Sequence, residues 1–116
     1  MAQYEDFSID QGTDVTVRLT LTELDNTPKI MTGIVPRAQI RKTFLSSDSD
    51  AVTFSASIFG ADSDGIIDLD LTNAQTAAMK EGSYVYDVEL LDSDAATIER
   101  VLEGRVKVNP RVTRIP

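Results

Sequence analysis

Hydrophobic and polar residues alternate with a period of two in several short segments of this sequence. The clearest segment is DVTVRLTLT at 14–22, in which valines and leucines share one face of an extended chain and threonines and an arginine share the other. This alternation is typical of a β-strand with one buried face. The same pattern predicts a short first strand with Phe7 and Ile9 facing the core, followed by a turn at Gln11-Gly12.

The alternation returns in five later segments. In the last of them it places Arg100 inward beside Leu102 and Val106, which is an unfavourable position for a charged side chain. Pro36 precedes the first of them and cannot donate to a sheet, so it marks a strand start, a sheet edge or a bulge. The segments are RAQIRK (37–42), AVTFSASIF (51–59), GIIDLDL (65–71), SYVYDVELL (83–91) and TIERVLEGRVKV (97–108).

One segment has helical character, LTNAQTAAMKEG at 71–82. Thr72 can cap its first turn, Gln75 completes a capping box, and Gly82 suits the exit, which predicts a short helix near residues 73–80. About seven strands and one helix predict an all-β fold, an immunoglobulin-like antiparallel β-sandwich, with a small closed barrel as the alternative. We expect one domain at 1–109 and an extended C-terminal tail at 110–116.

The amino-acid composition argues against several classes of function. Nineteen acidic and eleven basic residues give a net charge of −8, which argues against nucleic acid as a partner. Because cysteine and histidine are both absent, the usual nucleophile–base pairs and zinc ligands are missing, so we expect no enzymatic activity. The first residues resemble no export signal, and there is no apolar run of membrane-spanning length, so no membrane partner is expected.

An Asp-Ser-Asp triplet occurs three times, which raises the question of a calcium site. An EF-hand alignment that uses Gly65 as the loop glycine fails, because it puts Gly60 at the first position and Leu71 at the twelfth. Alternating strand directions place two triplets at one end of the sandwich and the third at the other. We therefore interpret them as turns and expect no metal and no cofactor. The triplet carboxylates are Asp62, Asp64, Asp92 and Asp94 at the first end, near Glu23 and Asp25, and Asp48 and Asp50 at the other, near the helix.

Two other patterns contain residues with candidate chemistry. Asp68 and Asp70 could imitate a glycosidase carboxylate pair, although a solvated strand face is the simpler interpretation. Tyr84 and Tyr86 could form a sugar-binding platform, although alternating tyrosines more often pack in a sheet.

Basic residues gather in the last strand and the tail, against an acidic remainder. They can form a docking strip for a negatively charged protein or another copy of the chain, or simply a solvated surface. They are Arg105, Lys107, Arg111 and Arg114.

Three segments together resemble a family of small tailed-bacteriophage proteins related to the N-terminal domain of the siphophage baseplate upper protein. They are the opening strand with Gln11-Gly12, the stretch from Pro28 to Gly33 that runs into Gln39–Arg41, and the unit from Leu71 to Leu90. The resemblance covers about residues 4–110.

This resemblance implies a non-enzymatic structural virion protein, assembled in the host cytoplasm, that acts as an adaptor in the tail, baseplate or neck. Its partners would be other phage structural proteins, in several symmetric copies. A capsid decoration protein and a carbohydrate-binding module are the alternatives. The contact residues expected from the first strand, last strand and tail are Phe7, Ile9, Arg105, Lys107, Arg111, Val112, Arg114 and Ile115.

Overall fold

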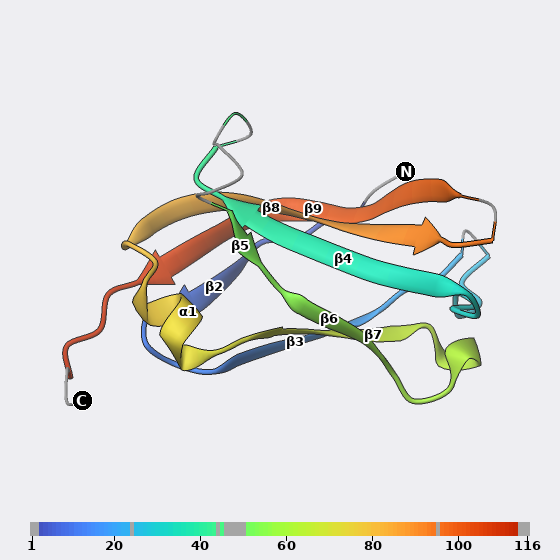
Figure 1. Ribbon diagram of the computed structural model, residues 1–116, viewed down its shortest axis with the longest axis horizontal. Helices are drawn as coiled ribbons and strands as arrows, with labels where there is room; N and C mark the ends of the chain where they lie inside the picture. Colours follow the sequence, from blue (N-terminus) through green and yellow to red (C-terminus); the bar gives the residue numbers. More distant parts are fainter. Residues whose placement is uncertain (1–2, 24, 44, 46–50, 95, 114–116) are drawn as a thin grey trace.

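The computed structural model describes residues 3–23, 25–43, 45, 51–94 and 96–113, and it forms two packed β-sheets (Figure 1). The elements are β1 (Gln3–Tyr4), β2 (Phe7–Asp10), β3 (Val15–Thr20), β4 (Ile34–Arg41), β5 (Val52–Thr53), β6 (Ser55–Phe59), the 3-10 turn η2 (Asp62–Asp64), β7 (Ile66–Leu71), α1 (Asn73–Ala77), β8 (Gly82–Asp92) and β9 (Thr97–Asn109).

The described strands divide into a sheet of six and a sheet of three. The larger sheet has the order β1-β9-β8-β4-β5, with β2 also paired to β9, and the smaller has the order β3-β7-β6. A β9-β8-β4 core sheet facing a β3-β7-β6 sheet is the immunoglobulin-like arrangement, so the predicted all-β sandwich is confirmed. Two pairings differ from an antiparallel fold, since β1 and β2 both run parallel to β9.

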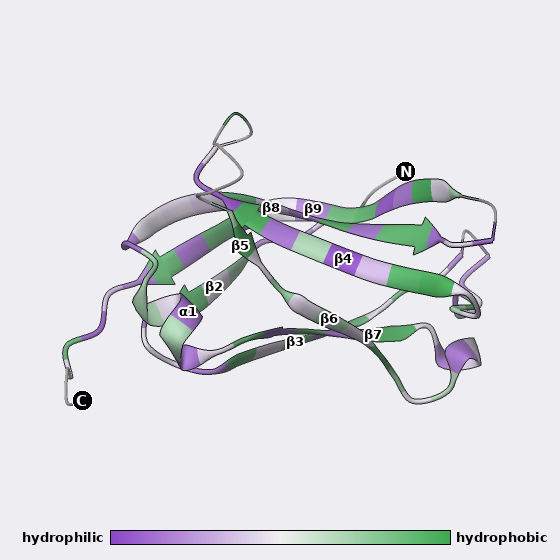
Figure 2. Cartoon of the chain, viewed as in Figure 1, coloured by the Kyte–Doolittle hydropathy of each residue, from purple (hydrophilic) through white to green (hydrophobic). Residues whose placement is uncertain are grey.

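The core lies between the sheets and is built from the inward residues of the alternating segments. Figure 2 shows the hydrophobic bands that recur along β4, β8 and β9. Ile9, Ile40, Leu69, Val88 and Val106 are each exposed by 1% or less, as the alternation predicts.

The strict alternation predicted for 97–108 is wrong at Arg100. The pairing of β8 and β9 shifts by one residue, since Val88 pairs with Leu102 whereas Glu89 pairs with Arg100. This β-bulge accommodates Val101 and reverses the faces before it. Arg100 therefore points to solvent and binds Asp87 at 3.3 Å and Glu103 at 3.5 Å.

Pro36 lies within β4, opposite Leu90 of β8. On its other side β4 pairs with β5 only at Gln39 and Ile40, so Pro36 occupies a free stretch of sheet edge. This confirms the edge alternative among the three that the sequence left open.

Helix α1 is shorter than the predicted 73–80, but it begins as predicted. The Thr72 hydroxyl accepts from the Gln75 backbone N–H at 3.2 Å, and the Gln75 side chain accepts from the Thr72 N–H at 2.9 Å. The capping box is therefore confirmed.

Candidate functional site: interaction surfaces

The first strand contributes to the core rather than to a surface. Ile9 is 1% exposed, and the Phe7 ring packs against Tyr86 at 4.8 Å and Phe54 at 6.4 Å between ring centroids. Their expected role as contact side chains is therefore wrong for Ile9, whose side chain is inaccessible, while Phe7 is half-buried within the same cluster.

The break between β1 and β2 passes very close to β9. The Glu5 N–H donates to Glu103 O at 2.9 Å, and the Asp6 carboxylate accepts from the Arg105 N–H at 2.8 Å. The Tyr86 hydroxyl donates to Glu5 O, and burial raises the pKa of Tyr86. Gly104 sits at the crossing, where a Cβ would lie 1.9 Å from Glu5 O. Only glycine leaves room for this approach.

The basic side chains of β9 are exposed as predicted. Arg105 and Lys107 lie on the outer face of the larger sheet, which is the face turned away from the core. Val112 is 93% exposed in the tail. The predicted contact residues Arg114 and Ile115 lie outside the described residues.

A hydrogen-bond network anchors the start of the tail to the turn after β2. Gln11 accepts from the Arg111 backbone N–H at 3.2 Å and donates to Met79 O at 2.7 Å. The Gly12 N–H donates to the hydroxyl of Thr76, which is fully buried and itself donates to Thr13 O at 2.7 Å.

The backbone conformation favours glycine at this anchor. The φ of Gly12, +83°, is a left-handed conformation that glycine adopts without strain, and the Arg111 side chain lies against it. A hollow of about 320 Å³ lies between this turn and residues 110–113. The sequence pattern predicts the turn at Gln11-Gly12 but not the hydrogen bonds of Gln11 and Thr76, although both residues belong to the motifs quoted for the family resemblance.

The acidic loops meet at the opposite end of the sandwich from α1 and the tail (Figure 1). The Met31 N–H donates to Asp62 O at 2.8 Å, and the Ser93 N–H donates to Gly33 O at 3.2 Å, which ties three loops together. The predicted shared end is therefore confirmed for the triplets at 62–64 and 92–94. Asp48 and Asp50 lie outside the described residues.

These carboxylates are used in turns. Asp64 accepts from the Ala61 N–H at 3.2 Å, and Asp92 accepts from the Asp94 N–H at 3.0 Å. Hydrogen bonds from Thr27 lower the pKa of Asp25. Among the described residues no group of three or more potential metal ligands converges.

The outer face of the larger sheet carries charges in register across three strands. Arg37, Glu89 and Arg100 form one row, and Gln39, Asp87 and Glu103 form the next. Arg37 and Glu89 are 3.6 Å apart. Because these side chains are substantially exposed, such pairs contribute little stability.

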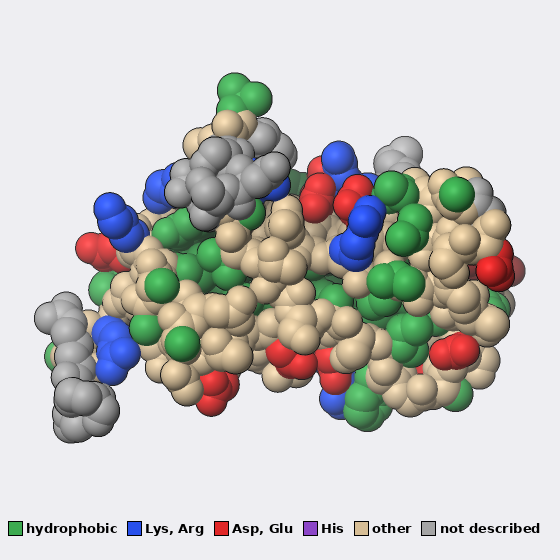
Figure 3. Space-filling view, in the orientation of Figure 1, with side chains coloured by type: hydrophobic (Ala, Val, Ile, Leu, Met, Phe, Trp, Pro, Cys, Tyr) green, Lys and Arg blue, Asp and Glu red, His purple; other side chains and the backbone are tan. Residues whose placement is uncertain are grey.

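A row of apolar side chains follows these charges toward the acidic end. Val35, Leu91 and Ile98 are aligned across β4, β8 and β9, and Val35 and Ile98 are 46% and 55% exposed. Figure 3 shows basic, acidic and apolar side chains interspersed along the side of the sandwich where β4 passes β6.

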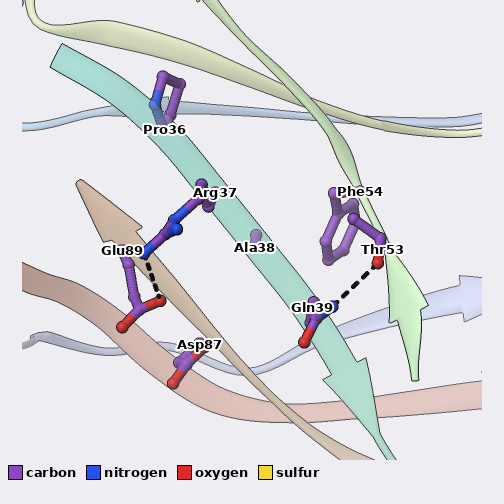
Figure 4. Close-up of a pocket in the computed structure, with 8 residues that line it drawn as sticks. All are labelled: Pro36, Arg37, Ala38, Gln39, Thr53, Phe54, Asp87 and Glu89. Atoms are coloured by element: carbon purple, nitrogen blue, oxygen red, sulfur yellow. Dashed lines mark hydrogen bonds and ion pairs between the residues drawn. The ribbon is translucent and has the colours of Figure 1, made fainter. Parts of the chain in front are cut away.

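A notch of about 330 Å³ opens where β5 leaves β4 and crosses to the smaller sheet as β6 (Figure 4). Arg37 points toward Glu89 on one side, and the Gln39 amide donates to the Thr53 hydroxyl at 3.1 Å on the other. Its polar groups are thus paired with one another and resemble no nucleophile–base arrangement.

The two other candidate patterns, Asp68 with Asp70 and Tyr84 with Tyr86, have structural roles. Arg18 lies 2.8 Å from Asp68 and holds the pKa of that carboxyl below its usual range, whereas a glycosidase acid requires a raised pKa. The Asp70 carboxylate accepts from the Thr16 hydroxyl at 2.7 Å. Tyr86 is 4% exposed, so it cannot form a sugar platform.

Comparisons with known proteins assign no family. No family model and no curated protein matches this sequence. The fold is similar to the crystal structure of InlP from Listeria monocytogenes, with a TM-score of 0.48 and 15% identity over 93% of this chain. This chain spans 28% of the InlP chain, and a likeness at this level carries no functional argument.

In the part of the chain that the structure describes, no helix has the length and apolarity that crossing a bilayer requires.

Proposed function

We propose that this protein is a non-enzymatic structural component of a tailed-phage virion. It serves as an adaptor in the tail, baseplate or neck and makes protein–protein contacts in several copies. The proposal takes its virion context from the motif resemblance at Gln11-Gly12, Pro28–Gly33 and Leu71–Leu90.

The observation that carries the proposal is the anchored basic segment at one end of an acidic domain. Arg105 and Lys107 are exposed on β9, and the chain continues through Pro110 and Arg111 against the Gln11-Gly12 turn. Because the anchor fixes where the chain leaves the domain, residues 110–113 are held in a defined position for contact with a neighbour. Such preorganisation lowers the entropic cost of binding.

Charge is separated along the molecule in a way that suits this role. The acidic loops around Asp62 and Asp92 lie at one end, and the basic segment leaves from the other. A basic strip on a protein of net charge −8 favours an acidic protein surface as its target and gives orientation as well as attraction.

Deletion of residues 110–116 tests the proposal. The isolated truncated protein should keep its far-UV circular dichroism spectrum, whereas purified phage particles should no longer contain it by mass spectrometry. A wild-type chain missing from purified particles, or a truncated chain incorporated normally, would refute the proposal.

Lys107→Glu and Lys80→Glu form a matched pair, because both replace an exposed lysine and change the net charge equally. Only Lys107→Glu should reduce incorporation. Equal effects would show that net charge matters and the strip does not. The copy number per particle separates an adaptor from a capsid decoration protein, which would be far more abundant.

A further inference from the structure

Strand β3 has an open edge. It is the terminal strand of the smaller sheet, and β7 is its partner within the described chain. The Leu21 N–H donates to Gly65 O at 2.7 Å, so the odd-numbered residues of β3 direct their backbone groups toward β7. Neighbouring residues of a strand direct these groups to opposite sides. Thr16, Arg18 and Thr20 therefore present N–H and C=O groups away from the sheet.

The other described edges are short or protected, since the terminal strands β1 and β5 of the larger sheet have only two residues each. Pro36 removes a donor from the free edge of β4, and β6 lies against β4 of the opposite sheet. Strand β2 is only four residues long, and its Asp10 C=O accepts from both the N–H and the hydroxyl of Thr13. Proteins commonly blunt edges in these ways. Strand β3 has six residues, no proline and no bulge.

The inner face of β3 is also incompletely covered. Its three inward side chains are only partly buried, whereas the residues opposite them on β7 are exposed by at most 2%. The apolar face of this edge would gain burial from one further strand. The inward residues are Val15, Val17 and Leu19, opposite Leu71, Leu69 and Ile67.

We infer that β3 pairs with β3 of a second copy, antiparallel and across a two-fold axis at Val17, so that the two smaller sheets form one continuous sheet of six strands. This inference is independent of the virion role. Val15 then faces Leu19 of the second copy, which extends the apolar inner face across the axis. The backbone groups of Thr16 and Arg18 pair with those of Arg18 and Thr16 of the second copy.

Strand overlap and charge together select this register. Axes at Val17 and Arg18 each pair five residues of β3, whereas axes at Thr16 and Leu19 pair only three. Thr16 is bound to Asp70, so Arg18 of the second copy meets a hydroxyl with a carboxylate beside it. Moving the two-fold axis by one residue, from Val17 to Arg18, would bring the two Arg18 side chains face to face. An axis at Leu19 would place Arg18 opposite Thr20, whose neighbour on β7 is the uncharged Ile66. Opposite charges across strands are favourable and like charges are not.

Cysteine cross-linking tests the pairing and its register. Because the sequence has no cysteine, a disulfide in Val17→Cys reports only on the introduced site. In the inferred register the two Val17 Cα atoms form a non-hydrogen-bonded pair about 4.5 Å apart, within disulfide range. Leu19→Cys is the matched control, because its two copies are separated by four strand residues, about 13 Å.

Under mild oxidation we expect Val17→Cys to give covalent dimers and Leu19→Cys to remain monomeric. If neither variant cross-links, or both do equally, the inference is wrong. Far-UV circular dichroism of the reduced variants confirms that both are folded, which excludes trapping of unfolded chains.

A second experiment removes one backbone donor. Thr16→Pro abolishes an N–H that points away from β7, whereas Thr16→Val removes only the hydroxyl that binds Asp70. By sedimentation velocity the wild type and Thr16→Val should form a dimer, and Thr16→Pro should dimerise at least about 10-fold more weakly. A wild type that stays monomeric, or a Thr16→Pro variant that dimerises equally well, overturns the inference.

Discussion

Replacing Gly104 with alanine should destabilise the fold through a steric conflict with the backbone of Glu5. The added Cβ would lie 1.9 Å from Glu5 O and 3.1 Å from an Asp6 carboxylate oxygen. Since a close C···O contact is about 3.3 Å, the Glu5 carbonyl would have to retreat by roughly 1.4 Å.

The expected loss in the free energy of unfolding follows from the hydrogen bonds that hold the Glu5–Asp6 segment against its neighbours. Three hydrogen bonds fix the Glu5–Asp6 segment: Glu5 N–H to Glu103 O, Arg105 N–H to the Asp6 carboxylate, and the Tyr86 hydroxyl to Glu5 O. Each contributes about 1 kcal/mol net, so their loss would cost about 3 kcal/mol. The cost of overpacking a well-packed site is of similar size, about 1–3 kcal/mol.

Urea unfolding monitored by far-UV circular dichroism measures the change in the free energy of unfolding. Deletion of residues 1–6 provides the control, because it removes the obstructing backbone. In the deleted chain Gly104→Ala should be neutral or slightly stabilising, since alanine loses less conformational entropy than glycine on folding. An equal penalty with and without residues 1–6 would refute the steric explanation.

Three further predictions concern the cap, an ion pair and the acidic end. Thr72→Ala should cost about 1 kcal/mol in urea unfolding through loss of the N-cap of α1, and Thr72→Ser should cost less; equal costs would contradict the capping role. Arg18 holds the pKa of Asp68 below its unfolded value, so the stability from this pair is present above that unfolded value, about 3.9, and is lost as pH falls through the lower folded pKa. Arg18→Met should raise the pKa of Asp68 in an NMR titration, and an unchanged titration would contradict the assignment. The melting temperature should be the same in calcium and in chelator, because the carboxylates of Asp64 and Asp92 accept backbone N–H groups in turns; a rise with calcium would reveal a site.

Local patterns in the sequence anticipated most of the strands and the start of the helix. Alternation at 14–22 and 51–71 identified the inward residues, because a strand with one buried face must repeat every two residues. The capping box at Thr72 and Gln75 involves residues only three positions apart, so it too can be predicted from the sequence. Alternating strand direction further placed the triplets at 62–64 and 92–94 at one end.

Contacts between segments that are far apart in the sequence could not be predicted from these local patterns. Arg100 was misplaced because a single bulge at Val101 reverses the alternation, and the bulge exists only in the pairing with β8. The expectation that Ile9 forms a contact surface is wrong for a related reason. Which strands cover β2 depends on how the sheets assemble.

Where the strands and the helix form depends on side-chain period and local hydrogen bonding, which the order of residues encodes directly. Which edges stay open and where backbones cross depends instead on the assembled fold. Two of these features join residues that are far apart in the chain: the parallel pairing of β2 with β9 and the approach of Glu5 to Gly104. A third, the edge of β3 that no described strand pairs with, lies at the boundary with solvent. Such features depend on the packing of whole sheets, and the residue pattern of one strand does not encode its neighbours.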